Sequence, residues 1–247
     1  MTGFADIHHH LLYGLDDGPR RMEETAAMLH RAAAEGITTL VATPHVTPGV
    51  QMFDRDAFLA RLAEARQYCA AQQLPLTLHA GAELLYTPQA ARFLREGRVP
   101  TLGDTPYALV EFSPDVRFDA LESALVDLLR SGFLPVLAHV ERYACLTHHV
   151  QRAIRLKQTC EVYYQVNCSA VLGRRGFWAD RCVDRLLKAQ LVDFVATDAH
   201  NTGTRPARMQ AAHRALQERV GPEYAAALTG LADGELVRML RATGAEN

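Results

Sequence analysis

Residues 4–10, Phe4-Ala5-Asp6-Ile7-His8-His9-His10, run from an apolar strand directly into three histidines. Side chains alternate between the two faces of a strand, so His8 and His10 point to one side and His9 to the other. Two imidazoles on one side can share a cation. Two solvated histidines would give the same pattern, so the ends of the other strands must decide between these readings.

The rest of the chain repeats the pattern of a short apolar run followed by an amphipathic helix. Helices are expected at residues 21–35, from an N-cap at Asp54 to about residue 73, and at residues 121–130. The run Thr39-Leu40-Val41-Ala42 is apolar on both faces, as in parallel strands covered by helices. This alternation predicts an α/β barrel or a doubly wound sheet. We expect about seven strands, at residues 4–8, 37–43, 76–83, 107–112, 134–139, 161–167 and 192–198.

Length and composition favour one globular domain over residues 1–247, with 49% hydrophobic residues. No apolar run is long enough to cross a bilayer and the N-terminus lacks the layout of a secretory signal, so we expect a soluble cytoplasmic protein. The net charge is -2 and the basic residues are scattered, which argues against nucleic acid and favours small or peptide substrates. Nothing in the sequence specifies an oligomeric state.

The five cysteines show no C-x-x-C spacing, so reduced thiols are expected and any metal must be held by nitrogen and oxygen ligands. Such ligands follow the strands. In α/β folds, ligands bind beyond the carboxyl ends of the strands. Helix-surface residues would instead be scattered, as His30, His148, His149 and His213 are. The strand-end candidates are His8, His10, His45, Glu83, Glu111, His139, Asp198 and His200.

Between the first strand and its helix lies Leu15-Asp16-Asp17-Gly18-Pro19, which has the composition of a turn that leads into a helix. One of the two aspartates can cap that helix or bind a metal. We favour Asp17 as the ligand.

These motifs resemble the bacterial polymerase-and-histidinol-phosphatase (PHP) superfamily, and within it the manganese-dependent protein-tyrosine phosphatases of capsule and exopolysaccharide operons. The resemblance covers about residues 4–206. It is carried, in order, by D-I-H-x-H, L-D-D-G-P, A-T-P-H, G-A-E, A-H-x-E-R-Y, Q-V-N and D-A-H-N followed by R-P.

The resemblance implies a distorted (β/α)7 TIM-like barrel that holds two or three divalent ions, with Mn²⁺ favoured and Fe²⁺ or Zn²⁺ as alternatives. One ion would bind His8, His10, Glu83 and Asp198. A second would bind Glu83, Glu111 and His139, and a third would bind Asp17, His45 and His200. Cations this close can hold a bridging hydroxide that attacks phosphorus.

Charge on the phosphoryl oxygens requires fixed positive partners, for which Arg142 and Arg205 are the candidates. Residues 46–53 and 113–118 carry Phe53, Pro114 and Phe118, which would either wall an aryl-phosphate pocket or serve as ordinary loop packing. His79 lies inside a strand and is expected to be a hydrogen-bonded core imidazole.

The resemblance implies action on a phosphotyrosine-containing protein, a bacterial tyrosine kinase of capsule or exopolysaccharide synthesis. The alternative is a small phosphate monoester such as histidinol phosphate. Two other mechanisms are alternatives to a metal-dependent phosphatase. Cys168 and Arg174 show the C-x5-R spacing of cysteine-dependent phosphatases, and the amidohydrolases share the H-x-H but use a strand-end lysine, whereas Lys157 and Lys188 fall in expected helices. A non-catalytic metal-binding protein is the last class.

Overall fold

The computed structural model describes residues 3–50, 52–173 and 176–244. All strand pairs in these segments are parallel, and helices follow most strands. The chain is therefore an α/β protein built on parallel sheets, as the alternation predicts. The strands are β1 Phe4–His9, β2 Ile37–Ala42, β3 His45–Val46, β4 Thr77–Ala80, β5 Glu83–Leu85, β6 Tyr107–Glu111, β7 Leu134–Leu137, β8 Tyr163–Asn167 and β9 Phe194–Ala196.

Two predicted helices begin and end close to where the sequence places them. Asp54 accepts a hydrogen bond from the Ala57 amide at 2.9 Å and so caps α2, which confirms the predicted N-cap. Besides two 3-10 turns, η1 Leu102–Asp104 and η2 Val140–Arg142, the helices are α1 Met22–Ala34, α2 Arg55–Ala71, α3 Ala90–Arg95, α4 Phe118–Arg130, α5 Ala144–Thr147, α6 Val150–Thr159, α7 Cys168–Val171, α8 Phe177–Lys188, α9 Met209–Val220, α10 Pro222–Leu228 and α11 Glu235–Gly244.

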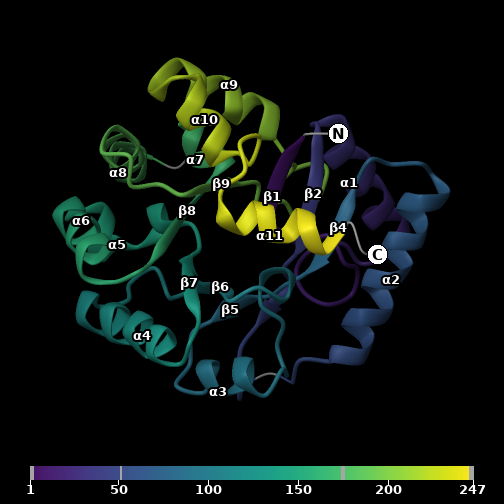
Figure 1. Ribbon diagram of the computed structural model, residues 1–247, viewed down its shortest axis with the longest axis horizontal. Helices are drawn as coiled ribbons and strands as arrows, with labels where there is room; N and C mark the ends of the chain where they lie inside the picture. The colour runs from purple at the N-terminus through teal and green to yellow at the C-terminus, as the bar shows by residue number, and fades with distance from the viewer. Residues whose placement is uncertain (1–2, 51, 174–175, 245–247) are drawn as a thin grey trace.

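The strands form two sheets, one with the order β1-β2-β4 and the other with the order β3-β5-β6-β7-β8-β9. The two sheets meet again where the last strand passes the first. There, His9 forms a bridge with Ala199, and the His10 amide donates to the Ala199 carbonyl at 2.9 Å. The strands thus curl around one interior, with helices around the outside (Figure 1).

One predicted strand is wrong in detail. Residues 76–83 do not form a single strand but split into β4 and β5, which belong to different sheets. The break falls at Gly81, where a Cβ atom would lie only 2.6 Å from the Val41 side chain. A matching break at Pro44, which has no amide hydrogen to donate, separates β2 from β3. Both strands therefore bend together, and His45 and Glu83 become direct neighbours across the β3–β5 pair.

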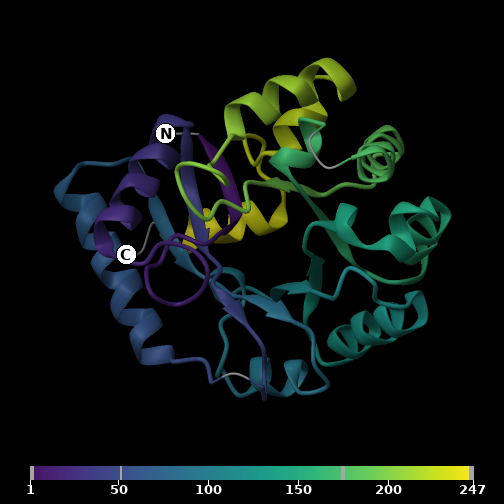
Figure 2. The same ribbon diagram turned by 180° about the vertical axis from the view of Figure 1, so that it is seen from behind.

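The interior of the curled sheets is filled from the strands and closed by a helix. Ile7, Val41 and Val136 pack in one buried apolar cluster with Leu236 and Leu240 of α11. In Figure 1, α11 lies across the strands, and the view from behind in Figure 2 shows the loops at the other end. Since Tyr107, the first residue of β6, belongs to the same cluster, α11 covers the amino-terminal ends of the strands.

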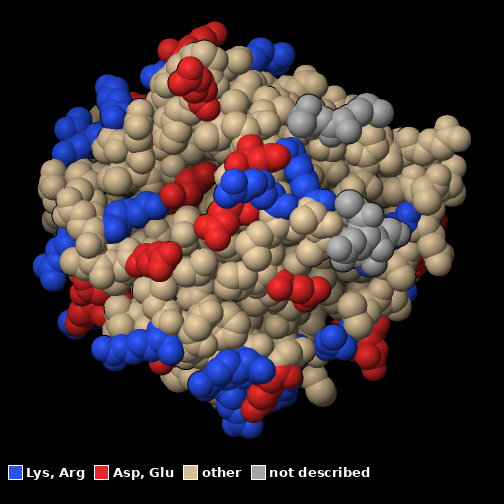
Figure 3. Space-filling view, in the orientation of Figure 1, with Lys and Arg blue, Asp and Glu red and all other residues tan. Residues whose placement is uncertain are grey.

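On the face where α11 lies, the described residues carry charges of both signs (Figure 3). Figure 3 shows acidic and basic side chains interspersed on this face. Within the described residues, no helix combines the length and apolar character needed to span a membrane.

Candidate metal centre

The nine candidate ligands come from seven separate segments, and the fold brings them together at the carboxyl ends of the strands. His8 lies in β1, with His10 immediately after it, and Glu83 and Glu111 lie in β5 and β6. Imidazole nitrogens and carboxylate oxygens of this set contact one another at 2.7 to 3.6 Å. The set comprises His8, His10, Asp17, His45, Glu83, Glu111, His139, Asp198 and His200.

The buried carboxylate of Glu83 is the centre of this cluster. Its Oε2 atom lies 3.1 Å from His8 Nε2, 3.2 Å from His10 Nε2 and 3.0 Å from His45 Nδ1. Despite these distances, Oε2 has no aligned hydrogen bond from any described residue. Buried carboxylate oxygens in folded proteins are nearly always paired. Donor atoms that converge on one point without bonding to one another are the arrangement that a metal ion requires.

Three of the histidines are oriented by a hydrogen bond at Nδ1, which leaves Nε2 directed into the cluster. His8 Nδ1 lies 3.1 Å from Gln165 Oε1, and His10 Nδ1 lies 2.7 Å from Asp16 Oδ2. His200 Nδ1 lies 3.1 Å from the Asp198 carbonyl, and its buried Nε2 has no hydrogen-bond partner among the described residues. An acceptor at Nδ1 fixes the tautomer in which Nε2 offers a lone pair, as metal-binding histidines require.

The donor atoms fall into three groups, each compact enough for one ion. Atoms of His8, His10 and Asp198 lie within 4.8 Å of one another, as do those of His45, Glu83 and Glu111, and those of His10, Asp17, His45 and His200. His139 Nε2 lies 2.7 Å from Glu83 Oε1 and 3.5 Å from Glu111 Oε2. Two residues differ from the expected sets. His45 lies against the Glu83–Glu111 pair as well as against Asp17 and His200, and His10 groups with Asp17, His45 and His200 as well as with His8 and Asp198.

Asp16 and Asp17, adjacent in the chain, take different places. The Asp17 carboxylate faces the cluster, 3.1 Å from His200 Nε2 and 3.4 Å from His45 Nε2. Asp16 instead accepts from His10 and from the Gly18 amide, and these bonds outweigh its burial and lower its pKa. Neither carboxylate caps α1, whose first turn has no side-chain cap. Asp17 is thus placed to bind a metal and Asp16 to orient His10.

Charges in the cluster are strongly coupled. Burial disfavours a charged His8, but Glu83 and Asp198 outweigh it and raise its pKa to about 9. The pKa of His45 is raised to about 11, because the Glu111 and Glu83 carboxylates beside its ring outweigh burial. The pKa of Glu83 is lowered well below its usual value, as the surrounding imidazoles outweigh its full burial. A site that holds buried carboxylates ionised and draws positive charge onto its imidazoles suits divalent cations.

Two of the candidate ligands have strained backbones. His139 has φ 34° and Asp198 has φ 51°, in the left-handed region that non-glycine residues rarely adopt. Strain of this kind concentrates at functional sites. At these two strand ends it turns the side chains toward Glu83 and His8.

The sequence reasoning gave no role to a buried pair of amides on β8. Gln165 Oε1 accepts from the His139 amide at 2.8 Å as well as contacting His8, and Gln165 Nε2 donates to Asn167 Oδ1 at 2.8 Å. Asn167 Nδ2 in turn donates to Asp198 Oδ2 at 2.7 Å. The only signal in the sequence was the Q-V-N spacing, which puts both amides on one face of a strand.

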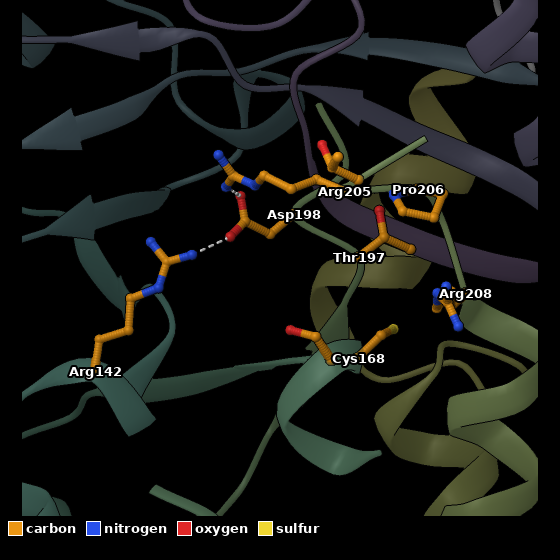
Figure 4. Close-up of a pocket in the computed structure, with 9 residues that line it drawn as sticks. Arg142, Cys168, Thr197, Asp198, Arg205, Pro206 and Arg208 are labelled. Atoms are coloured by element: carbon orange, nitrogen blue, oxygen red, sulfur yellow. Dashed lines mark hydrogen bonds and ion pairs between the residues drawn. The ribbon is translucent and has the colours of Figure 1, made fainter. Parts of the chain in front are cut away.

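Arg142 and Arg205 converge on the same carboxylate. Arg142 Nη2 donates to Asp198 Oδ2 at 2.5 Å, and Arg205 Nη2 donates to Asp198 Oδ1 at 2.9 Å. They line a pocket of about 460 Å³, drawn in Figure 4. Both candidate phosphate-binding side chains therefore border the cluster from the solvent side.

The predicted aryl-pocket residues separate. Phe53 borders a pocket of about 160 Å³ together with His45, Leu15 and Pro44. Phe118 instead begins α4 and lies 5.5 Å beneath the guanidinium of Arg152. The Pro114 carbonyl accepts a backbone hydrogen bond from Ala144, as in ordinary loop packing.

His79 is buried, as expected, but the predicted hydrogen bond is absent at Nε2, which has no partner among the described residues. Its surroundings include Gly103 and Gly244, and the latter belongs to α11.

The cysteine mechanism does not fit the structure. Cys168 is 2% exposed, burial raises its pKa far above that of a free thiol, and its Sγ donates to Met209 Sδ at 3.9 Å. Arg174, the other half of the C-x5-R motif, lies outside the described residues. A buried protonated thiol is not a nucleophile. Lys157 and Lys188 lie in α6 and α8 and not after a strand, so neither is the strand-end lysine of amidohydrolases.

Comparison with known proteins agrees with this geometry. Residues 4–238 match the family model described as "Capsular polysaccharide synthesis, CpsB/CapC". The chain is 31% identical to the tyrosine-protein phosphatase CpsB of Streptococcus pneumoniae over 89% of this chain and 92% of that protein. It is 30% identical to the tyrosine-protein phosphatase YwqE of Bacillus subtilis over 91% of this chain and 88% of that protein.

A solved structure extends the likeness to three dimensions. It is described as one of YwqE from Bacillus subtilis and CpsB from Streptococcus pneumoniae, "unique metal-dependent tyrosine phosphatases". The match has a TM-score of 0.86 and 29% identity, and it covers 96% of this chain and 94% of that one. From its family model, its relatives and its fold, this chain belongs to the CpsB/CapC family of capsular polysaccharide synthesis.

Proposed function

We propose that this chain is a metal-dependent protein-tyrosine phosphatase. The observation that carries the proposal is the buried Glu83 Oε2 atom, on which three imidazoles converge at 3.0 to 3.2 Å without an aligned hydrogen bond to it among the described residues. Two arginines beside it supply the positive charge that a phosphate ester requires. Relatives named as tyrosine-protein phosphatases support the substrate class.

The proposed ligand sets follow the groups of donor atoms. His8, His10, Glu83 and Asp198 would hold one ion, and Glu83, Glu111 and His139 a second. Asp17, His45 and His200 would hold a third, with His45 also in reach of the second. Nitrogen and oxygen donors of this kind suit Mn²⁺, Fe²⁺ or Zn²⁺, and we propose Mn²⁺. When bound, such ions stabilise charge on phosphoryl oxygens and lower the pKa of coordinated water.

The arginines would bind and orient the phosphate. Each uses one Nη atom to contact Asp198, and Arg205 Nη1 also donates to Asp17 Oδ2 at 3.4 Å. A guanidinium has five N–H donors, so others remain for the phosphoryl oxygens. Asp198 therefore fixes both guanidinium groups before the substrate arrives. A phenolate leaves readily, so cleavage of a tyrosyl ester needs little help from a general acid.

The physiological substrate that we propose is phosphotyrosine on a bacterial tyrosine kinase of capsule or exopolysaccharide synthesis, in the cytoplasm. The description of the family model supports this choice. We further propose that residues 1–247 form a single domain with the (β/α)7 organisation that the sequence resemblance implies.

Metal-dependent turnover of phosphotyrosine peptides tests the proposal. The chain should hydrolyse them with added Mn²⁺ and lose activity in chelator, and Cys168→Ser should retain activity. Arg142→Gln and Arg205→Gln should each lower kcat/KM about 100-fold, as expected for loss of a transition-state donor, and the exposed Arg117→Gln serves as the control. Selective hydrolysis of histidinol phosphate would instead favour the small-ester alternative, and activity that resists chelation would refute the proposal.

A further inference from the structure

The pocket that contains Arg142 and Arg205 has a third arginine, Arg208, for which the proposed chemistry has no use. Among the described residues that line this pocket of about 460 Å³, three are arginines and Asp198 is the only carboxylate. The lining thus carries an excess of two positive charges. Clefts lined by one sign of charge concentrate ligands of the opposite sign.

The three arginines differ in what they contact. Arg142 and Arg205 both donate to Asp198. The guanidinium of Arg208 is half-buried and forms no hydrogen bond or ion pair with any other side chain in the described part of the chain. A planar guanidinium fork matches the paired oxygens of a carboxylate or phosphate. Arg208 is therefore a cation of this pocket that no described carboxylate engages, and it is available to a further anionic group of a ligand.

Arg208 lies apart from the place that the reacting phosphate would occupy. Figure 4 shows Arg142 and Arg208 on opposite sides of the pocket, with Asp198 and Thr197 between them. The phosphate would lie with Arg142 and Arg205, next to the metal cluster. An anion at Arg208 must then be a second group on the substrate.

The backbone fixes the spacing of these two anion positions. Arg205 and Arg208 lie on the same connection, residues 197–208, between β9 and α9. The Arg205 amide donates to Asn201 Oδ1 at 3.0 Å, and the Arg208 carbonyl accepts from the Ala212 amide at 3.1 Å in the first turn of α9. Hydrogen bonds thus fix the backbone at both arginines. Their side chains can therefore bind two anionic groups that lie a fixed distance apart.

We propose that Arg208 binds an anionic side chain next to the phosphotyrosine of the substrate, either the carboxylate of Asp or Glu or a second phosphate. This inference rests on the proposed phosphatase function and assigns the sequence context that the site prefers. Arg208 is in this view a specificity residue rather than a catalytic one.

The test compares one phosphotyrosine peptide with Glu, Gln or Lys on both sides of the phosphotyrosine, at saturating Mn²⁺. Wild-type protein should prefer the Glu peptide over the Gln peptide by about 3- to 10-fold in kcat/KM, the effect of one charge-assisted contact at a half-exposed site. Arg208→Gln should bring this ratio close to one. Arg208→Glu should shift the preference to the Lys peptide, a gain that misfolding cannot imitate.

Arg214→Gln is the matched control, because it removes an exposed arginine from α9 that does not line the pocket, and it should keep the wild-type preference. A doubly phosphorylated peptide with Gln neighbours identifies the source of the anion. If wild type prefers it to the Glu peptide and Arg208→Gln does not, the partner is a second phosphate. If the Glu peptide is preferred, the partner is a carboxylate.

Binding of the same peptides with a non-hydrolysable phosphonate in place of the phosphate gives a readout that does not depend on turnover. The Kd values should show the same Glu-over-Gln preference and the same loss in Arg208→Gln. Equal Kd values for wild type, or a preference that survives in Arg208→Gln, would overturn the inference. Failure of the proposed function looks different, since wild type would then hydrolyse none of the peptides with Mn²⁺.

Discussion

At the scale of single residues, the candidate site depends on side chains that orient the proposed ligands. Gln165 is the clearest case, because its one carbonyl oxygen contacts both the His8 ring and the His139 amide. Asp16 does the same for His10. Such supporting groups fix the tautomer and the ring orientation, and they tune the affinity of a metal site.

Gln165→Ala should weaken Mn²⁺ binding about 10- to 100-fold, because the His8 ring and the backbone at His139 lose their shared acceptor. Titration calorimetry of the metal-free protein measures this affinity. Activity should recover in part at high Mn²⁺. Gln217→Ala removes an exposed glutamine of α9 and serves as the control. Wild-type affinity in Gln165→Ala would show that the amide does not orient the ligands.

At the scale of elements, the carboxyl ends and the amino-terminal ends of the strands differ in what they contact. The carboxyl ends of the strands hold the polar cluster, and α11 closes the amino-terminal ends with Leu236 and Leu240, both almost fully buried. His79 lies on β4 beneath the C-terminal turn of α11, where a Cβ on Gly244 would be 3.3 Å from its ring. A proton on this imidazole would place a charge beside the packed C-terminal turn of α11.

The pH dependence of stability tests this contact. Burial, and then the charge of Arg66, lower the pKa of His79 to about 4, although Asp104 opposes the shift. A histidine in the unfolded chain titrates near 6.5, so between about pH 6.5 and 4 the unfolded state takes up a proton that the folded state does not. The free energy of unfolding therefore falls as the pH falls through this range.

His79→Gln should remove this pH dependence. Between pH 6.5 and 4 its free energy of unfolding should fall by about 1 to 2 kcal/mol less than that of the wild type, a difference that allows for solvent screening of a partly exposed group. Urea unfolding at both pH values, with chelator present to keep the metal cluster in one state, measures the difference. An equal loss in the two proteins would mean that His79 accepts a proton without affecting the fold.

At the scale of the whole molecule, the cluster joins segments from residue 8 to residue 200. Asp198 meets His8 across the point where the last strand passes the first, and the Asp198 amide also donates to the His8 carbonyl at 2.9 Å. Ions bound there would link β1, an edge strand of one sheet, to the segment after β9, an edge strand of the other sheet. Metal binding should then stabilise the entire fold and not only the loops.

Saturating Mn²⁺, at about 100 times the Kd, should raise the Tm by about 5 to 10 °C relative to chelated protein, from mass action on the folded state. Differential scanning calorimetry measures the shift. Glu83→Gln, which removes the central carboxylate charge, should abolish most of it. A Tm that does not respond to Mn²⁺ would contradict a metal site made of segments so far apart in the chain.

The sequence by itself determined the α/β class, the alternation of strands and helices, and the alignment of polar residues at strand ends. These features are local, because alternation within a strand fixes which side chains share a face, and parallel strands place their carboxyl ends together. His8, Glu111 and His139 could be identified in this way. The capping role of Asp54 was equally local.

Only the tertiary structure decided which atoms meet. The breaks at Pro44 and Gly81 move β3 and β5 into the second sheet and place His45 beside Glu83, a result of packing against Val41 that no local pattern contains. The roles of Gln165 and Arg208 also depend on neighbours distant in the chain. Local propensities set the direction of a side chain, but distances between side chains depend on the register and bending of the whole sheet.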